Sequence, residues 1–288
     1  MDIFLQSLIN GILTGGVYAA YSAGFSLIFG VMEVINLAHG DLLMIGAFTA
    51  YWLFKIAKIN PYYSIPIAGI VLFFTGYLIQ RFIINRVINK PPVMTYILTF
   101  GIHLVITNFA VKIWTHDFRT ITTSYSGLNF TIGNIIIPTS RLTTFLLSFL
   151  IIAVLFYLLE KTDIGRAIRA VSQNKKVAQL LGVEVEKIYA LTFGIGAAIT
   201  GIAGASISPF VILYPDMGLN YTITAFCVVV LGGMGYIPGA LIGGFILGII
   251  QSLSVTYLNA GISVAITFIL LYLMLILKPR GITGRGIV

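Results

Sequence analysis

Long, uninterrupted stretches of apolar residues dominate the pattern of hydrophobic and polar positions, and short clusters of polar residues separate them. A helix needs about 20 mostly apolar residues to cross a bilayer, and the stretches lack the alternation of a transmembrane strand. The pattern therefore predicts an all-α, polytopic bundle of about eight transmembrane segments that forms a single domain over residues 1–288. The predicted spans are 5–31, 34–54, 62–80, 93–115, 141–159, 188–212, 221–256 and 261–277.

The seventh of these spans is interrupted near its middle. Residues 221–231 are too short to cross a bilayer, and the run LGGMGYIPG at 231–239 then breaks the helix. Irregular backbone at membrane depth is tolerated only where protein or a watery cavity surrounds it. We therefore predict a broken or re-entrant helix that dips to the middle of the membrane and returns along 240–256. The glycines of the break are Gly232, Gly233 and Gly235.

Basic residues gather in two predicted loops, 81–90 and 160–187, and in the C-terminal tail up to Arg285. Because Lys and Arg accumulate in cytoplasmic loops, these three segments are predicted to be cytoplasmic. The N-terminus and the loop 116–140 then lie on the extracytoplasmic side. An even number of simple crossings would bring the tail back to the starting side, and the re-entrant segment removes this conflict. Lys55 and Lys58 fall on the outer side, against the general trend.

Composition excludes a water-soluble protein. Hydrophobic residues make up 58% of the chain and charged residues only 9%, whereas a soluble domain needs a charged exterior. Membrane topology explains the net charge of +8 better than nucleic-acid binding does. The chain has one cysteine, Cys227, so no intrachain disulfide is expected, and no cluster of Cys and His indicates a metal site. The N-terminal sequence lacks the features of a removable signal peptide.

Three polar residues stand inside an otherwise apolar predicted span, in VINLAHGDLLMIGAF at 34–48: Asn36, His39 and Asp41. An Asp at the centre of a lone helix costs about 2.5–3.5 kcal/mol on insertion scales, so such groups face a protein interior or a watery path. One interpretation is structural: Asn36 and His39 cap broken helix ends, and Asp41 caps a helix that begins at Leu42. The other is that all three line the path of a zwitterionic substrate.

Other polar residues and a second glycine-containing helix break also lie within the predicted spans. His103 and Asn108 are predicted to hydrogen-bond between helices, and Lys112 to extend to the outer interface. The segments NLAHGD at 36–41 and LGGMGYIPG at 231–239 both combine an apolar run with a glycine-containing break. Transporters built from internal repeats bring such discontinuous helices together near the membrane centre. The two segments are therefore candidates for equivalent positions in a weak repeat.

Small residues recur at every fourth position in several predicted helices, a spacing that lets helix backbones approach closely in lipid. The sets are Gly11, Gly15 and Ala19; Gly16, Ala20 and Gly24; Ala197, Gly201 and Ala205; and Gly235, Gly239 and Gly243. Packing within the chain is the favoured interpretation, and a seam between two subunits is the alternative.

The loop 160–187 predicts two short helices. Thr162 or Asp163 can cap the first, which runs through about Val171, and Asn174 can cap the second, which ends at Gly182. The second helix places Val177, Leu180 and Leu181 on one apolar face. That face could lie on the membrane surface or fill a groove on a partner protein, and an ordinary cytoplasmic loop remains the simpler interpretation.

Several motifs in the same order resemble one transporter family. They are NGILTGGVYAAYSAGFSLIFGVMEVINLAHGDLLMIGA near the N-terminus, GRAIRAVSQNKKVAQLLGVEVEKIYALTFGIGAAITGIAG after residue 164, VVLGGMGYIPGALIGGFILGIIQSL, and the ending LKPRGITGRG. Together they resemble the permease subunits of bacterial ABC importers for branched-chain amino acids, the LivH type, almost from end to end.

This resemblance implies a multi-pass protein of a bacterial plasma (inner) membrane with several partners. These would be a second, homologous permease subunit, two cytoplasmic ATP-binding subunits and an extracytoplasmic substrate-binding protein. The loop 160–187 would dock into an ATPase groove as the coupling segment. The residues that the resemblance implies for this role are Gly165, Arg166, Arg169, Asn174, Ala178, Leu181 and Gly182. Related permeases move leucine, isoleucine and valine, and close relatives take urea, other amino acids or small amides.

The residues themselves favour the same division of labour. The chain has no G-x-x-x-x-G-K-[ST] loop, so it is expected to bind no cofactor itself and to leave ATP to partner subunits. No motif combines a nucleophile, a base and an orienting group, so neither an enzyme nor a catalytic site is expected. The alternative function is an ion-coupled secondary transporter or channel for a small polar solute, because buried His and Asp beside broken helices occur there too.

The predicted extracytoplasmic loop 116–140 carries an alternation of Thr, Phe and Ile and the dipeptide Gly133–Asn134. Both features predict a small β-hairpin. It lies on the side from which a binding protein would arrive, so contact with that protein and a plain surface loop are both open.

Overall fold

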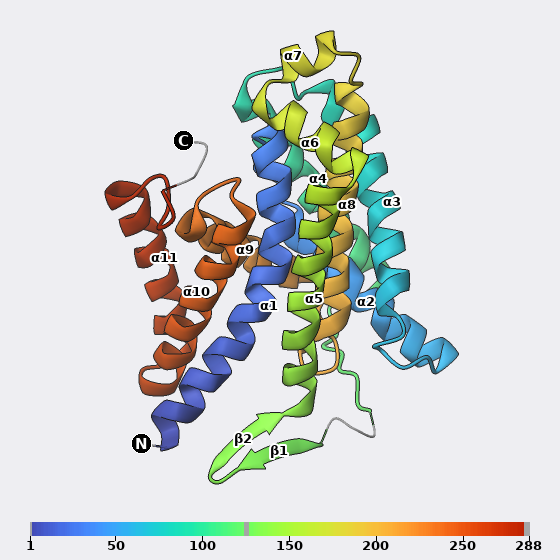
Figure 1. Ribbon diagram of the computed structural model, residues 1–288. Helices are drawn as coiled ribbons and strands as arrows, with labels where there is room; N and C mark the ends of the chain where they lie inside the picture. The colour runs from blue at the N-terminus through green and yellow to red at the C-terminus, as the bar shows by residue number, and fades with distance from the viewer. Residues whose placement is uncertain (1, 124–126, 285–288) are drawn as a thin grey trace.

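The computed structural model describes residues 2–123 and 127–284. Arg285 of the basic tail and residues 124–126 of the outer loop lie outside this range. Helices make up most of the fold, with one two-stranded sheet (Figure 1). The longer helices are α1 (Asp2–Met32), α2 (His39–Ala57), α3 (Ile65–Phe82), α4 (Pro92–Trp114), α5 (Thr139–Lys161), α8 (Val185–Ile207), α9 (Gly218–Gly232), α10 (Ile237–Tyr257) and α11 (Ala260–Leu277). The shorter elements are η1 (Ile84–Arg86), β1 (Asn129–Ile132), β2 (Ile135–Pro138), α6 (Asp163–Gln173), α7 (Lys175–Leu180) and η2 (Pro215–Met217).

Nine helical segments in the described part of the chain are long and apolar enough to cross a membrane. The prediction of a polytopic helical bundle is confirmed. The N-terminus and the β-hairpin lie at one end of the bundle, whereas α7 lies at the other (Figure 1). We call these the hairpin end and the α7 end. The C-terminal tail follows α11 at the α7 end, as the predicted topology requires.

The break inside the predicted span 221–256 is real, but it does not lie at mid-membrane. A Cβ on Gly30, near the C-terminal end of α1, would lie 2.9 Å from the carbonyl oxygen of Gly235. The break therefore sits towards the α7 end of the bundle. Together with the turn at Pro215–Met217, α9 forms an 18-residue segment that is long and apolar enough to cross a membrane, and α10 is a second such segment. The predicted helix break is confirmed, whereas the predicted dip to the middle of the membrane is wrong, because α9 begins at Gly218, before its apolar run, and reaches the α7 end.

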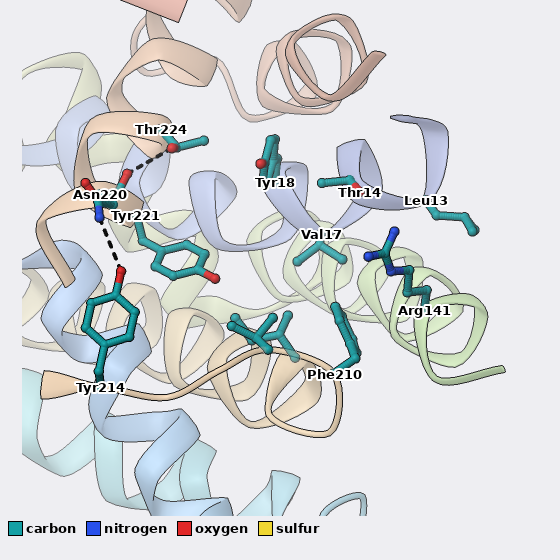
Figure 2. Close-up of a pocket in the computed structure, with 12 residues that line it drawn as sticks. Leu13, Thr14, Val17, Tyr18, Arg141, Phe210, Tyr214, Asn220, Tyr221 and Thr224 are labelled. Carbon is teal, nitrogen blue, oxygen red and sulfur yellow. Dashed lines mark hydrogen bonds between the residues drawn. The ribbon is translucent and has the colours of Figure 1, made fainter. Parts of the chain in front are cut away.

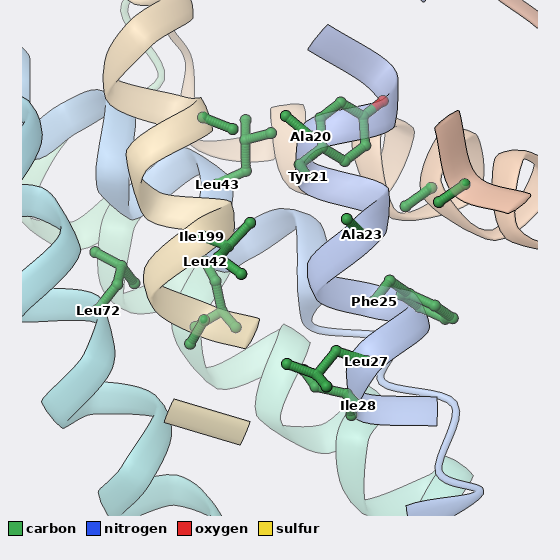
Figure 3. Packing of buried hydrophobic residues seen from close by; sticks show 14 of the residues in the cluster. Ala20, Tyr21, Ala23, Phe25, Leu27, Ile28, Leu42, Leu43, Leu72 and Ile199 are labelled. Atoms are coloured by element: carbon green, nitrogen blue, oxygen red, sulfur yellow. The ribbon is translucent and has the colours of Figure 1, made fainter. Parts of the chain in front are cut away.

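Helix α1 is the centre of the bundle, and α11 is its most peripheral span. In the most apolar window of each helix, 83% of residues are buried in α1 but only 11% in α11. Ile28 of α1 belongs to the same buried cluster as Leu42 of α2 and Ile199 of α8 (Figure 3). Outward-facing apolar side chains on the peripheral helices suit a lipid environment, because hydrocarbon is as apolar as they are.

The stripes of small residues pack helices together within the chain, as favoured. A Cβ on Gly15 would lie 2.8 Å from the Cα of Phe245 in α10, and one on Gly24 would lie 2.6 Å from the carbonyl oxygen of Gly196 in α8. At Gly201, a Cβ would lie 2.5 Å from the side chain of Leu72. Because even one extra carbon would clash, these positions set the distances from α1 to α10 and α8, and from α8 to α3.

The predicted hairpin is present. Strands β1 and β2 pair antiparallel, and Gly133 in their turn has a φ of +61°. Gln6 of α1 binds the backbone of Ile136 through two hydrogen bonds of 2.8 Å, so the hairpin is fixed to the first turns of α1.

Candidate functional site

The segment between α5 and α8 folds into two short helices, as predicted. Thr162 caps α6 by accepting a hydrogen bond from the backbone N–H of Gly165 at 3.0 Å. Gly165, Ile168 and Val171 are buried on the bundle side of α6. A Cβ on Gly165 would lie 2.3 Å from the carbonyl oxygen of Leu158, so α6 packs directly onto the end of α5. The segment therefore has a fixed base on the membrane helices.

Helix α7 presents apolar side chains away from that base. The Asn174 side chain caps it by accepting from the N–H groups of Lys176 and Val177 at 3.1 Å each. Ala178 is buried, but Leu180 is 87% and Leu181 78% exposed. The chain leaves the helix through Gly182, whose φ of +85° is a left-handed conformation that suits glycine. Two exposed leucines thus stand side by side at the end of a capped helix that is anchored to the bundle.

The two arginines of α6 have different surroundings. Arg166 pairs with Asp163 one turn earlier, and both side chains are exposed. Arg169 donates to the carbonyl oxygen of Leu159 and lies 4.0 Å from a carboxylate oxygen of Glu160. Arg169 thus ties α6 to α5, whereas the ion pair of Arg166 lies within α6 at the surface.

A polar groove of about 580 Å³ lies beside α7. Its lining includes Arg81 of α3, Asn85 of η1, Gln179 of α7, Glu184 of the α7–α8 connection and Lys187 of α8. The exposed leucines and this groove together form a surface with an apolar projection and a charged recess at the α7 end.

The helical structure is interrupted between α1 and α2, at residues 33–38. Asn36 is buried and accepts a hydrogen bond from the backbone N–H of Ala38 at 3.1 Å. His39 Nε2 lies 2.9 Å from the carbonyl oxygen of Tyr21, in the body of α1. Helix α2 therefore starts deep inside the bundle, and the preceding residues return from the end of α1 to reach that point.

Asp41 does not cap a helix, contrary to one of the sequence interpretations. Helix α2 begins at His39 rather than Leu42, and its N-cap position makes no side-chain hydrogen bond. The Asp41 carboxylate instead accepts from Nδ1 of His103 in α4 at 2.7 Å. The predicted interhelical role of His103 is confirmed, whereas Asn108 donates to Leu104 of its own helix at 2.7 Å.

The start of α9 meets the start of α2. The N–H of Gly40 donates to the hydroxyl of Thr222 at 2.8 Å. A Cβ on Gly218 would lie 2.0 Å from a carboxylate oxygen of Asp41. The segment that packs against NLAHGD is therefore 218–222. If the two breaks were equivalent parts of a repeat that meet in the bundle, the packed segment would be 231–239.

The second break is closed by the C-terminal tail. Gly233 and Gly235 have φ values of +106° and +82°, which explains their residue type. The N–H of Ile282 donates to the carbonyl oxygen of Leu231 at 2.8 Å, and Thr283 donates to that of Gly232 at 2.7 Å. The tail thus binds carbonyl groups that the last turn of α9 would leave without partners.

A cavity of about 360 Å³ lies between the hairpin-end half of α1, the start of α5 and the connection from α8 to α9 (Figure 2). Arg141, Tyr18 and Tyr221 are among its polar lining residues. Asn36, His39 and Asp41 do not line it. Sequence reasoning missed this cavity, although an arginine at the outer end of an apolar span was a visible signal.

Comparison with known proteins now decides the family. The profile of one family, described as "Branched-chain amino acid transport system / permease component", matches residues 7–277. The chain belongs to this permease family. It is 31% identical to the high-affinity branched-chain amino acid transport system permease protein LivH of Salmonella typhimurium, with 98% of this chain and 96% of the relative covered.

More distant permeases are also similar over most of their length. The protein BraD of Pseudomonas aeruginosa, named for the same transport system, is 29% identical over 98% of this chain and 96% of its own. The ribose import permease RbsC of Haemophilus influenzae is 26% identical over 87% of this chain and 78% of its own. No solved structure matches the chain.

Membership of the family, together with the membrane-length helices, makes the chain a multi-pass protein of the bacterial inner membrane. The described residues contain no group of three or more His, Cys, Asp or Glu side chains placed to hold a metal ion.

Proposed function

We propose that the chain is the permease subunit of an ATP-driven ABC importer and forms the translocation pathway for branched-chain or related small amino acids. The observation that carries this is the α6–α7 segment, which is fixed to the bundle through Gly165 and exposes Leu180 and Leu181 beyond it. A helix seated in this way can pass a movement of a docked ATPase to the membrane helices. The proposed substrate class comes from the names of the chain's relatives.

The proposed complex contains this chain, a second homologous permease subunit, two cytoplasmic ATP-binding subunits and an extracytoplasmic binding protein. ATP hydrolysis belongs to the ATP-binding subunits, and the chain itself binds no cofactor. The apolar end of α7 would fill a groove on an ATP-binding subunit, in the manner of other helix-in-groove contacts. The hairpin end would face the binding protein.

The residues at the two breaks hold the discontinuous helices in place beside the pathway. Asn36, His39 and Asp41 do this at the start of α2. Gly232, Gly233 and Gly235 do it between α9 and α10. Both breaks border α9, so a displacement of α9 would change the packing at both.

An ion-coupled carrier is the second candidate, and the buried Asp41–His103 pair is the observation that favours it. Acidic and imidazole groups inside membrane proteins form proton relays in pumps and transporters. That function would need no ATPase, and the chain alone would couple the movement of the solute to the movement of an ion down its gradient.

Reconstitution in proteoliposomes separates the two candidates. The complete complex, with leucine-loaded binding protein outside and ATP inside, is expected to accumulate radiolabelled leucine, and a pH gradient without ATP is expected to drive none. Gradient-driven uptake by this chain alone would favour the carrier. A complex that assembles and hydrolyses ATP but moves no leucine, isoleucine or valine would contradict the proposed substrate.

A further inference from the structure

Arg141 is the one charged side chain among the described residues that line the cavity beside α1. Arg141 is half-buried, and its guanidinium makes no hydrogen bond or ion pair with any described residue. The nearest aromatic contact is the ring of Phe210, whose centroid lies 6.0 Å from the guanidinium carbon. An arginine inside a membrane protein is costly unless it is paired or solvated. Arg141 therefore offers its full set of donors to an anion in the cavity.

The wall around Arg141 is mostly apolar. Leu13 and Val17 of α1 contribute to it, and Ile207 and Val211 at the end of α8 complete it. Figure 2 shows Val17, Phe210 and Arg141 around the same space. A volume of about 360 Å³ lies at the lower end of the range for small-molecule sites, about 300–1,000 Å³. The combination suits a small molecule with one anionic group and an aliphatic side chain.

The remaining polar groups of the cavity are neutral. No Asp or Glu lines it in the described part of the chain. The Tyr18 hydroxyl donates to Gln251 at 2.7 Å, but the Tyr221 hydroxyl makes no hydrogen bond with a described residue. Tyr221 can thus accept a hydrogen bond from an ammonium group. Since a carboxylate partner for the cation is missing, the binding of a zwitterion here would be weak, as a transit site requires.

We propose that this cavity is a transit site for a zwitterionic aliphatic amino acid and that Arg141 binds its α-carboxylate. This proposal rests on the proposed import function, and it assigns that function to a place and a residue. Guanidinium and carboxylate pair through two parallel hydrogen bonds, which fixes orientation as well as position. The aliphatic side chain would lie on the wall of Leu13, Val17 and Val211, and the ammonium group would face Tyr221.

The location fits a pathway. Tyr221 stands on the first turns of α9, and its neighbour Thr222 contacts Gly40 at the start of α2. The cavity therefore adjoins the place where the two helices that start inside the bundle meet. A substrate bound at Arg141 would contact α9 directly, so a displacement of α9 would move one wall of its site.

Chemical protection of Arg141 in the assembled complex tests the binding directly. Phenylglyoxal modifies accessible guanidinium groups, and mass spectrometry quantifies the modification of each arginine. Millimolar leucine is expected to slow the modification of Arg141, and isoamylamine, which lacks the carboxylate, is not. Arg86 is the internal control, because it is exposed and does not line the cavity, and it should react equally in all samples. No protection by leucine, or equal protection by both compounds, would overturn the proposal.

Uptake by variants separates a failure of this proposal from a failure of the import function. In the ATP-driven assay, Arg141→Gln is expected to reduce the initial rate of leucine uptake about 10-fold or more, because a charge-assisted pair is worth at least one factor of ten. Arg141→Lys keeps the positive charge but cannot form two parallel hydrogen bonds with a carboxylate. Its initial rate of uptake is expected to lie between those of Arg141→Gln and the natural protein. Lys112→Gln removes an exposed charge of α4 and is the control.

If the natural complex imports leucine with ATP and Arg141→Gln assembles and imports equally fast, the transit site is wrong and the import function stands. If the natural complex does not import leucine, the proposed function itself fails. Co-purification of Arg141→Gln with the partner subunits establishes that the variant is folded.

Discussion

His103 donates a hydrogen bond from Nδ1 to a carboxylate oxygen of Asp41 at 2.7 Å and so joins α4 to α2 inside the bundle. Asp41 is 0% and His103 7% exposed. Thr107, one turn further along α4, lies 3.5 Å from the other carboxylate oxygen. The pair explains why a membrane segment carries an acidic residue: a buried polar group is tolerated when another buried group satisfies it.

Substitution of Asp41 tests whether this pair is structural. Asp41→Asn keeps an acceptor oxygen and is expected to cost about 1 kcal/mol, whereas Asp41→Ala leaves the imidazole N–H unpaired and costs about 3 kcal/mol. Thermal unfolding can be followed by a thiol-reactive dye, because Cys227 is the one cysteine and is buried. The expected order of melting temperature is natural protein, Asp41→Asn, Asp41→Ala.

The double variant Asp41→Ala/His103→Leu is the control, and it should recover part of the loss because neither partner remains unpaired. A measurement of uptake can contradict the structural interpretation of the pair. If Asp41→Asn folds normally but abolishes ATP-driven uptake, the charge itself is required, and a proton relay replaces the structural interpretation.

Thr222 is expected to hold α2 and α9 together at their N-termini. Its hydroxyl accepts from the Gly40 N–H at 2.8 Å, which is one of the N–H groups that the first turn of α2 cannot satisfy itself. Thr222→Val keeps the shape and removes this partner, so a loss of about 1–3 kcal/mol is expected. The dye assay measures it.

Thr192→Val is the matched control for that prediction. Thr192 is equally buried, but its hydroxyl donates to Ile188 of its own helix at 2.8 Å, so its loss leaves no N–H group without a partner. Equal melting temperatures for the two variants would show that the contact between α2 and α9 contributes nothing to stability.

Gly248 tests the close contact between α1 and α10. A Cβ there would lie 2.5 Å from the Cα of Gly15 and 2.6 Å from the carbonyl oxygen of Gly11. Gly248→Ala must push the two helices apart and is expected to cost about 1–3 kcal/mol. Gly101→Ala in α4 meets no atom within 4 Å and should stabilise its helix by about 0.5–1 kcal/mol. The same sign for both changes in melting temperature would contradict helix crowding.

The exposed end of α7 should affect coupling without affecting the fold. Leu180 is 87% exposed, so Leu180→Glu is expected to leave the melting temperature unchanged. In co-purification, the variant is expected to retain about 10-fold less of the ATP-binding subunit. The reason is that the substitution removes about 1.4 kcal/mol of apolar contact with that subunit. Lys175→Gln changes the net charge by the same amount on the same helix and should retain its partner. Undiminished uptake with Leu180→Glu would remove α7 from the interface.

Local structure followed local sequence closely. The caps at Thr162 and Asn174, the left-handed Gly182 and the turn at Gly133 depend on neighbouring residues, and all of them lie where their motifs predicted. The break after Gly232 was also predictable, because glycine and proline interrupt a helix wherever it packs. Its depth was not, since depth depends on where α9 starts.

The sequence by itself determined that this is a membrane-embedded helical protein and which family it belongs to, because long apolar runs and ordered motifs are properties of the chain read in one dimension. The tertiary structure decided how its polar groups are paired. Helix α2 has no side-chain cap of its own; Thr222 binds its N–H group, and His103 binds Asp41. Both partners lie far away in the sequence, and only packing brings them within hydrogen-bond reach. The same packing places Arg141 beside α1 and α9 and so creates the cavity.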